Sequence, residues 1–247
     1  MTNAFKTGRV QAVYVIHDRR FADRAEHMEA QLGRFDIPFE YILNHDATTI
    51  TPELRHRFTA ADYDLANGKL SCALKHFDAL RRIATGGFRR ALVLEDDAIL
   101  EKDFHGELLA ILEECLSFSH PFTVQLGCAN NRFTPRSRLR PGQRLYEAGE
   151  VRANEAFLIN AAAAQLRLDW FEHNKLSHST DCTFNIVDHL QGIRTYWAEP
   201  TVVVQGSATG RFASHLDIKQ MKRPLWMVRA RFWLQRLRKK HVYGRLQ

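Results

Sequence analysis

Three consecutive carboxylates end a short apolar segment in the first half of the chain. Residues 91–100 read Ala-Leu-Val-Leu-Glu-Asp-Asp-Ala-Ile-Leu, so the acids are Glu95, Asp96 and Asp97. Because alternate residues of an extended chain point the same way, Glu95 and Asp97 are predicted to project together and Asp96 elsewhere. Two convergent carboxylates suit Mg²⁺ or Mn²⁺ with open positions for a phosphorylated substrate. The alternative is a turn or a helix N-terminus enriched in acids.

The composition is that of a folded domain. The chain has 247 residues, 45% of them hydrophobic and 11% aromatic, which excludes a disordered protein and fits one domain or two small ones. The N-terminus lacks the apolar segment of a signal peptide, and no stretch approaches the roughly 18 apolar residues of a membrane span. The cysteines are scattered, which indicates reduced thiols of a cytoplasmic protein: Cys72, Cys115, Cys128 and Cys182.

The positive charge is concentrated at the C-terminus. Residues 219–247 contain ten Lys or Arg and no acid, so the net charge of +7 leaves 7 − 10 = −3 for residues 1–218. We therefore predict a slightly acidic domain over 1–218 and a basic arm over 219–247.

The arm also carries apolar residues at helical spacing. Large apolar side chains against Arg and Lys are typical of a helix that lies on an anionic membrane surface. The alternative is a helix docked on the domain with its cations in solvent. Nucleic acid is not an expected partner, because no recognition motif accompanies the charge. The apolar residues are Leu225, Trp226, Val228, Phe232, Trp233 and Leu237.

Hydrophobic periodicity predicts alternating strands and helices, hence an α/β fold with a mostly parallel sheet. Strands are expected at 10–16, 39–43, 91–94, 122–126, 156–159, 195–197 and 201–205. Helices are expected at 21–32 with Gly33 as a stop, after Thr51, at 68–83, at 104–116, in the alanine-rich segment after 159, and at 180–190. Residues 130–150 are predicted to be one long irregular loop.

Five blocks of sequence, taken in order, resemble glycosyltransferase family 25 over about residues 13–205. The acidic block 92–97 corresponds to the family's acidic motif, and Gly68-Lys-Leu-Ser-Cys-Ala-Leu-Lys-His76 is similar to its Gly-Glu-Ile-Gly-Cys-Ala-x-Ser-His. The others are Val15-Ile16 with Arg24 and residues 28–32, then 37–40, then Asp181 with Pro200 and Gln205. Departures include Lys69, Ser71 and the absence of the family's usual glycine from residues 44–48.

The resemblance implies a GT-A type fold, in which a Rossmann-like sheet flanked by helices binds a nucleotide-sugar and a divalent metal. It implies inverting transfer, usually of galactose from UDP-galactose, onto a lipopolysaccharide or lipooligosaccharide glycan. Glu95 and Asp97 would hold Mn²⁺ or Mg²⁺, and Asp96 would support them or contact the donor. The protein is then expected on the inner face of the cytoplasmic membrane. The alternatives are another nucleotide-sugar-dependent transferase and a catalytically silent, membrane-peripheral homologue.

An inverting transfer needs a general base beside the acceptor hydroxyl. By the family pattern Asp181 is the first candidate, and a helix N-cap is its alternative role. Asp188 and Glu155 are the other two candidates.

Three further residues are expected to contact the donor. His76 matches the family motif, although its position beside an apolar helix face also fits a structural histidine. Arg24 is suited to pair with the diphosphate, or it is a solvated helix arginine. Asp46 follows the second strand, where such sheets often contact nucleosides, or it is a plain loop acid.

Overall fold

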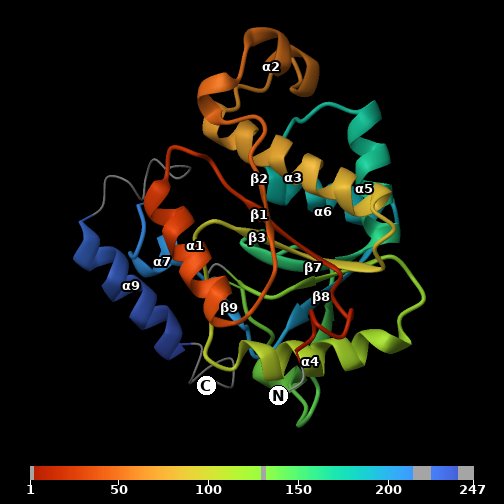
Figure 1. The fold of residues 1–247 in the computed structure, drawn as a ribbon, viewed down its shortest axis with the longest axis vertical. Coiled ribbons are helices and arrows are strands. Elements are labelled where there is room, and N and C mark those ends of the chain that lie inside the picture. Colours follow the sequence, from red (N-terminus) through yellow and green to blue (C-terminus); the bar gives the residue numbers. More distant parts are fainter. Residues whose placement is uncertain (1–2, 129–131, 214–223, 239–247) are drawn as a thin grey trace.

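The computed structural model describes residues 3–128, 132–213 and 224–238. Within them, a seven-stranded sheet runs through the centre of the protein (Figure 1). Its strands, in spatial order, are β2 (Glu40–Ile42), β1 (Ala12–Ile16), β3 (Arg90–Glu95), β7 (Ala156–Asn160), β5 (Phe122–Gln125), β8 (Arg194–Ala198) and β6 (Leu145–Ala148). The helices are α1 (Ala22–Arg34), α2 (Pro52–Phe58), α3 (Asn67–Thr85), α4 (Phe104–Glu114), α5 (Ala161–His173), α6 (Thr180–Leu190), α7 (Gly206–Thr209) and α9 (Leu225–Arg238).

The sheet is mostly parallel, as predicted. β1 pairs in parallel with β2 and β3, and β5 pairs in parallel with β8. β7 is antiparallel to both β3 and β5, and β6 is antiparallel to β8. Five of the seven described strands therefore share one direction. The chain passes from β1 to β2 on one side and then to β3 on the other, so a switch in strand order lies between β1 and β3.

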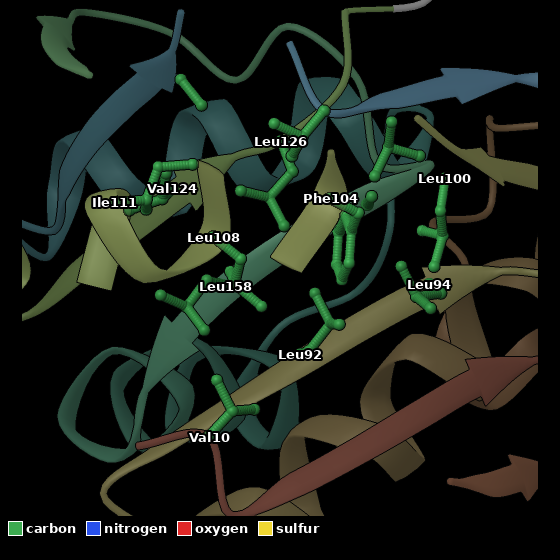
Figure 2. Packing of buried hydrophobic residues seen from close by; sticks show 14 of the residues in the cluster. Val10, Leu92, Leu94, Leu100, Phe104, Leu108, Ile111, Val124, Leu126 and Leu158 are labelled. Atoms are coloured by element: carbon green, nitrogen blue, oxygen red, sulfur yellow. The ribbon is translucent and has the colours of Figure 1, made fainter. Parts of the chain in front are cut away.

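Helices cover both faces of the sheet, because successive strand side chains point to opposite faces. Val13 and Val15 of β1 face the layer that contains α1 and α4, and Figure 2 shows α4 residues packed on this face. Tyr14 and Ile16 face the layer of α3, α5 and α6. The chain therefore folds as a three-layer α/β/α sandwich, with the loops at the strand ends left to carry a site.

Two strands were not predicted. β6 lies inside the segment 130–150 that was expected to be irregular, and it extends the edge of the sheet beside β8. β4 (Ala98–Leu100) pairs antiparallel with β9 (Val203–Gln205) in a separate two-stranded sheet. Both are short edge strands without clear apolar alternation, which explains why periodicity did not reveal them.

Helix boundaries were predicted to within two residues, but one of the signals used to place them was wrong. Thr51 caps α2, since its side chain accepts a hydrogen bond from the N–H of Leu54, as expected of a Thr-Pro helix start. Gly33 was predicted to stop the first helix, but α1 continues through it to Arg34. Helix packing against the sheet outweighs the cost of one internal glycine.

Only the first residue of the acidic segment lies in a strand, whereas its side-chain directions were predicted for an extended chain throughout. β3 ends at Glu95, and Asp96 and Asp97 form a turn before β4. The rule of alternation therefore does not apply beyond Glu95. The three carboxylates instead face three different elements, α3, α1 and α7.

The described part of the basic arm is the helix α9, which packs on α7. Residues 219–223 and 239–247 of the predicted arm lie outside the described residues. Nowhere in the described chain is there a helix with both the length and the apolar content to cross a bilayer.

Candidate functional site

A pocket of about 690 Å³, including space open to solvent, lies where β1 and β3 end. It therefore sits at the carboxyl ends of parallel strands, beside the switch in strand order, where open α/β sheets bind their ligands. α1 and α3 form its walls, and the end of β9 with α7 completes it. Its polar lining consists of His17, Asp18, Arg20, Arg24, Ser71, Cys72, Lys75, Glu95, Asp96, Asp97, Gln205 and Ser207.

Asp96 is buried and fully engaged by two basic side chains. Its Oδ1 accepts a hydrogen bond from Nη1 of Arg24 at 2.6 Å, and its Oδ2 lies 2.9 Å from Nδ1 of His17. Burial disfavours the charge of Arg24, but the charges of Asp96 and Asp97 outweigh this effect and raise its pKa. Asp96 thus fixes Arg24 on the pocket wall, and neither of its oxygens is left over for a ligand.

Asp97 is also buried but keeps one oxygen without a partner. Its Oδ2 accepts a hydrogen bond from the backbone N–H of Ser207 at 3.0 Å, while Oδ1 is buried and makes no hydrogen bond. Burial raises the pKa of Asp97, although the charge of Arg24 and hydrogen bonding from the side chain and N–H of Ser207 act in the opposite direction. An unpartnered carboxylate oxygen in a pocket is costly unless a ligand such as a cation binds it.

Glu95 faces α3. Its Oε1 lies 3.4 Å from Nε2 of His76 and 3.7 Å from Sγ of Cys72. Burial, followed by the neighbouring charges of Asp97 and Asp181, raises the pKa of Glu95 well above its ordinary value. Because Asp97 is the strongest of these charges, the two predicted metal ligands lie close enough to repel each other. A divalent cation would relieve this repulsion, so their chemistry fits such an ion.

His76 is completely buried and is not part of the pocket surface. Its ring stacks on Phe157 and meets Phe184 edge-on, and burial lowers its pKa to about 4. It therefore positions Glu95 rather than contacting a donor, in contrast to the prediction. Cys72 lies on the pocket surface one helical turn earlier, and burial raises the pKa of its thiol well above the ordinary value.

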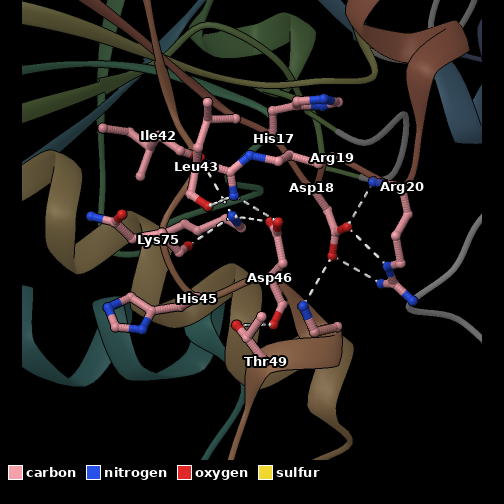
Figure 3. Close-up of polar contacts among 12 residues, drawn as sticks. His17, Asp18, Arg19, Arg20, Ile42, Leu43, His45, Asp46, Thr49 and Lys75 are labelled. Atoms are coloured by element: carbon pink, nitrogen blue, oxygen red, sulfur yellow. Dashed lines mark hydrogen bonds and ion pairs between the residues drawn. The ribbon is translucent and has the colours of Figure 1, made fainter.

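Asp46 supports the pocket from behind (Figure 3). Its Oδ1 accepts from Nζ of Lys75 at 2.7 Å, and its Oδ2 accepts from Nη1 of Arg19 at 2.9 Å. Burial favours the protonated acid, but these hydrogen bonds outweigh it and hold the pKa of Asp46 below its usual value. Lys75 lines the pocket, whereas Asp46 does not. Asp46 was predicted to contact the donor, but in the structure it positions Lys75 on the pocket wall.

A second ion pair borders the pocket in the same figure. Asp18 accepts two hydrogen bonds from the guanidinium of Arg20, at 2.9 Å each, and one from the N–H of Ala47 at 3.1 Å. Burial alone would raise the pKa of Asp18, but these bonds hold it far below its ordinary value. The carboxylate of Asp18 is therefore ionised and keeps Arg20 at the pocket rim.

The three candidate bases fall in different environments. Asp188 is buried between α5 and α6, where both of its oxygens accept hydrogen bonds from the guanidinium of Arg167 at 2.7 and 2.8 Å. Glu155 is buried behind β3, with its carboxylate against Gly127 and its carbonyl accepting from the N–H of Glu95. Both carboxylates are buried away from solvent, so an acceptor hydroxyl cannot reach them and neither can serve as the base.

Asp181 stands in the first turn of α6, with Ser179 as the N-cap, so it does not cap the helix itself. Its side chain is reached by solvent, yet enough protein surrounds the carboxyl group that desolvation raises its pKa against the charges of His76 and Arg132. Its charge also acts on Glu95. Asp181 therefore lies near the pocket, accessible to a substrate.

Sequence reasoning missed the polar residues that follow β1. His17, Asp18 and Arg20 were not among the predicted site residues, although residues after a buried parallel strand are expected at the ligand edge of a sheet. Lys75 was missed because it lies among the apolar positions of α3. Ser207 was missed because no local pattern shows that its N–H and its side chain reach Asp97, 110 positions away.

The fold and this pocket define an α/β protein with a carboxylate-rich site at the switch point of its sheet. The model of glycosyltransferase family 25 (LPS biosynthesis protein) matches residues 10–147, which is 138 of 247 positions. The chain belongs to glycosyltransferase family 25, as its motifs predicted. Membership assigns it to the glycosyltransferases of lipopolysaccharide biosynthesis. The match includes the acidic turn but ends before Glu155, Asp181 and Asp188.

Other comparisons add little. No curated protein matches the chain. Among solved structures, one described as a glucose-1-phosphate thymidylyltransferase from Bacillus anthracis in complex with a sucrose is similar at 10% identity. The alignment covers 91% of this chain and 79% of that one, with a TM-score of 0.38.

Proposed function

We propose that this chain transfers galactose from UDP-galactose, with inversion, onto a lipopolysaccharide or lipooligosaccharide glycan, and that its α/β sandwich is of the GT-A type. The observation that carries the proposal is the unpartnered, buried Oδ1 of Asp97 beside Glu95 in the pocket. Family membership supports the reaction class, and the resemblance of the acidic motif and of residues 68–76 supports the donor.

Glu95 and Asp97 are the residues that would hold Mn²⁺ or Mg²⁺. When bound, the cation would offset the charge of the donor diphosphate and the charge that develops on the departing nucleoside diphosphate. Hard oxygen ligands with open positions are the set these ions prefer. The raised pKa values of both acids are consistent with a site that is completed by positive charge.

Three cations of the chain are available to the diphosphate. Arg20, Arg24 and Lys75 line the pocket, and each is paired with its own buried acid. The pairs leave N–H groups of Arg20 and Arg24 unused, since a guanidinium has five. The ammonium of Lys75 donates to Asp46, Asn44 and Ile42, so Lys75 contributes positive charge rather than a free N–H group. The pocket can therefore bind a diphosphate in one orientation.

Asp181 is the residue that would remove the proton from the acceptor hydroxyl. It is the one acid of the three candidates that is accessible to a substrate, and desolvation raises its pKa toward a range useful to a base. The acceptor would then approach from the side of α6.

The test is a donor panel. Purified protein is incubated with Mn²⁺ and each of several UDP-sugars, and release of UDP by hydrolysis or transfer is measured. UDP-galactose is expected to give the fastest turnover, and chelation of the metal is expected to abolish it. Preference for another sugar would indicate a different nucleotide-sugar-dependent transferase. No turnover and no binding with any donor would indicate a silent homologue.

For the arm, we propose association with the anionic inner face of the cytoplasmic membrane. α9 packs on the rest of the protein through Phe232, which is buried, and through Arg236, which pairs with Glu101. This side of the helix therefore docks on the domain, as in the alternative given for the arm. The opposite side carries Trp226, Trp233 and Leu234, which are 70%, 61% and 67% exposed. Six of the nine exposed large apolar residues of the described chain are on this helix, together with solvated arginines. Such a face matches a lipid surface of negative charge.

Vesicle sedimentation tests this association. The double variant Trp226→Ala/Leu234→Ala is expected to lose most of its binding to vesicles that contain anionic lipid. The matched control, Leu116→Ala/Leu190→Ala, removes two exposed leucines elsewhere and should pellet like the parent protein. Equal pelleting of all three proteins would refute the proposal.

A further inference from the structure

Three different metal-ligating atoms meet on the α3 wall of the pocket. Sγ of Cys72, a ring nitrogen of His76 and a carboxylate oxygen of Glu95 all lie within 4.8 Å of one another. Cys72 and His76 are four positions apart, so they share one face of α3, and Glu95 ends β3 opposite them. We propose that these residues form a site for Zn²⁺ or a similar thiophilic divalent cation, which is an alternative to the hard-cation site expected at Glu95 and Asp97 because both use Glu95.

Two of the three distances between the ligand atoms match those around a tetrahedral ion. With Zn–N of about 2.05 Å, Zn–O of about 2.1 Å and Zn–S of about 2.3 Å, tetrahedral angles place N and O roughly 3.4 Å apart and S and O roughly 3.6 Å apart. His76 Nε2 and Glu95 Oε1 are 3.4 Å apart, and Cys72 Sγ and Glu95 Oε1 are 3.7 Å apart. The N···O distance exceeds the roughly 2.9 Å typical of a hydrogen bond, so the atoms leave space for an ion between them.

The site is rigid on one side and open on the other. Phe157 and Phe184 hold the buried ring of His76 in place, so little conformational freedom is lost when an ion binds. Cys72 and Glu95 line the pocket, which leaves a fourth ligand position to water or substrate. Asp181 adds a negative charge that acts on both Cys72 and Glu95. A coordinating thiolate and imidazole favour zinc over Mg²⁺, and binding would release the thiol proton to solvent.

This inference does not depend on the proposed sugar transfer. The zinc site would nevertheless affect that reaction, because Glu95 would belong to both metal sites. A zinc ion bound here would withdraw Glu95 from the expected Mn²⁺ or Mg²⁺ position. Zinc is therefore expected to compete with Mn²⁺ and Mg²⁺ for binding and not to take over their role in donor binding.

Cobalt(II) titration of the reduced, metal-free protein tests the site without any donor. The parent protein is expected to bind one Co²⁺ with a near-ultraviolet thiolate-to-cobalt absorption, which added Zn²⁺ then abolishes. Cys72→Ser should fold, since the side chain is half-buried, and should lose this band. His76→Gln should weaken or abolish it, provided circular dichroism shows a folded chain.

The matched control is Cys182→Ser, which removes an exposed thiol on α6 and should retain the band. Absence of the band in the parent protein, its persistence in Cys72→Ser, or its loss in Cys182→Ser would each overturn the proposal. Because the readout is spectroscopic, failure of the proposed transfer activity would leave this result unaffected.

Discussion

The backbone N–H of Ser207 donates a 3.0 Å hydrogen bond to Oδ2 of Asp97, 110 positions earlier in the chain. Next to it, the N–H of Gly206 donates to the carbonyl of Asp97 at 2.7 Å. The start of α7 thus holds the acidic turn through two backbone N–H groups. Because these bind Oδ2 and the carbonyl of Asp97, its Oδ1 remains for a ligand. The placement of the acid therefore depends on how closely the two segments approach.

Gly206→Ala tests this close approach. A Cβ at position 206 would lie 2.6 Å from the carbonyl oxygen of Asp97 and 2.7 Å from the ring of Phe212, so the turn and α7 must separate. We expect unfolding free energy to fall by about 1–3 kcal/mol, as for overpacking in a dense interior. Metal-dependent donor binding should weaken as well.

The matched control is Gly33→Ala, which adds a methyl group inside α1 where nothing lies within 4 Å. It is expected to raise the unfolding free energy by about 0.5–1 kcal/mol and to leave donor binding unchanged. Chemical denaturation of the three proteins compares them directly. Equal stability of Gly206→Ala and the parent would contradict the packing described for α7.

Asp46→Ala should destabilise the protein and change its response to acid. Lys75 is buried and would lose its counter-charge, which costs about 3–5 kcal/mol when one partner of a buried pair is removed. The pKa of Asp46 is lower in the folded than in the unfolded protein. Its contribution is therefore present above the unfolded-state pKa of about 3.9 and is lost as the pH falls through the folded-state value.

Urea denaturation between pH 2 and pH 7 measures this contribution. The stability difference between parent and variant should be largest near neutral pH and should shrink below about pH 4. Asp62→Ala, which removes an exposed acid, is the control and should show no such difference. A difference for Asp46→Ala that is constant over the whole range would argue against an ionised Asp46.

Asp181→Asn should slow sugar transfer without loss of donor binding. Loss of a general base typically costs about 10²–10⁴-fold in rate. The variant should still bind UDP-galactose with Mn²⁺, because Asp181 does not line the pocket, and loss of its charge near Glu95 should change this affinity far less than the transfer rate. Glu172→Gln, at an exposed acid near the end of α5, serves as the control and should react at the parental rate. Parental activity in Asp181→Asn would remove it as the base.

The sequence predicted the sheet and its flanking helices because apolar periodicity is a local property. It also placed the acids at a strand end. It misjudged the directions of Glu95, Asp96 and Asp97, because the turn after β3 is set by pairing of β4 with β9, about 100 residues away. It offered Asp188 as one of three candidate bases, because nothing local reveals that the guanidinium of Arg167 packs against it.

The loop after β2 shows the same limit. The family's usual glycine is missing from residues 44–48, and the structure places His45 there at a φ of 63°, a left-handed conformation that favours glycine. The chain keeps the turn with a histidine, and Asp46, which follows directly, still reaches Lys75. Sequence alone signalled the missing glycine but not that position 45 adopts a conformation that glycine favours.

The most direct test of the central claim is calorimetric titration of UDP-galactose into the parent protein and Asp97→Ala, each with Mn²⁺ and with a chelator. The parent should bind the donor with Mn²⁺ and lose binding in the chelator. Asp97→Ala should bind about a hundredfold more weakly or worse, since a bound metal contributes several kcal/mol. Donor binding that is equally tight without metal, or unchanged in Asp97→Ala, would contradict the assignment of this pocket as a metal-dependent donor site.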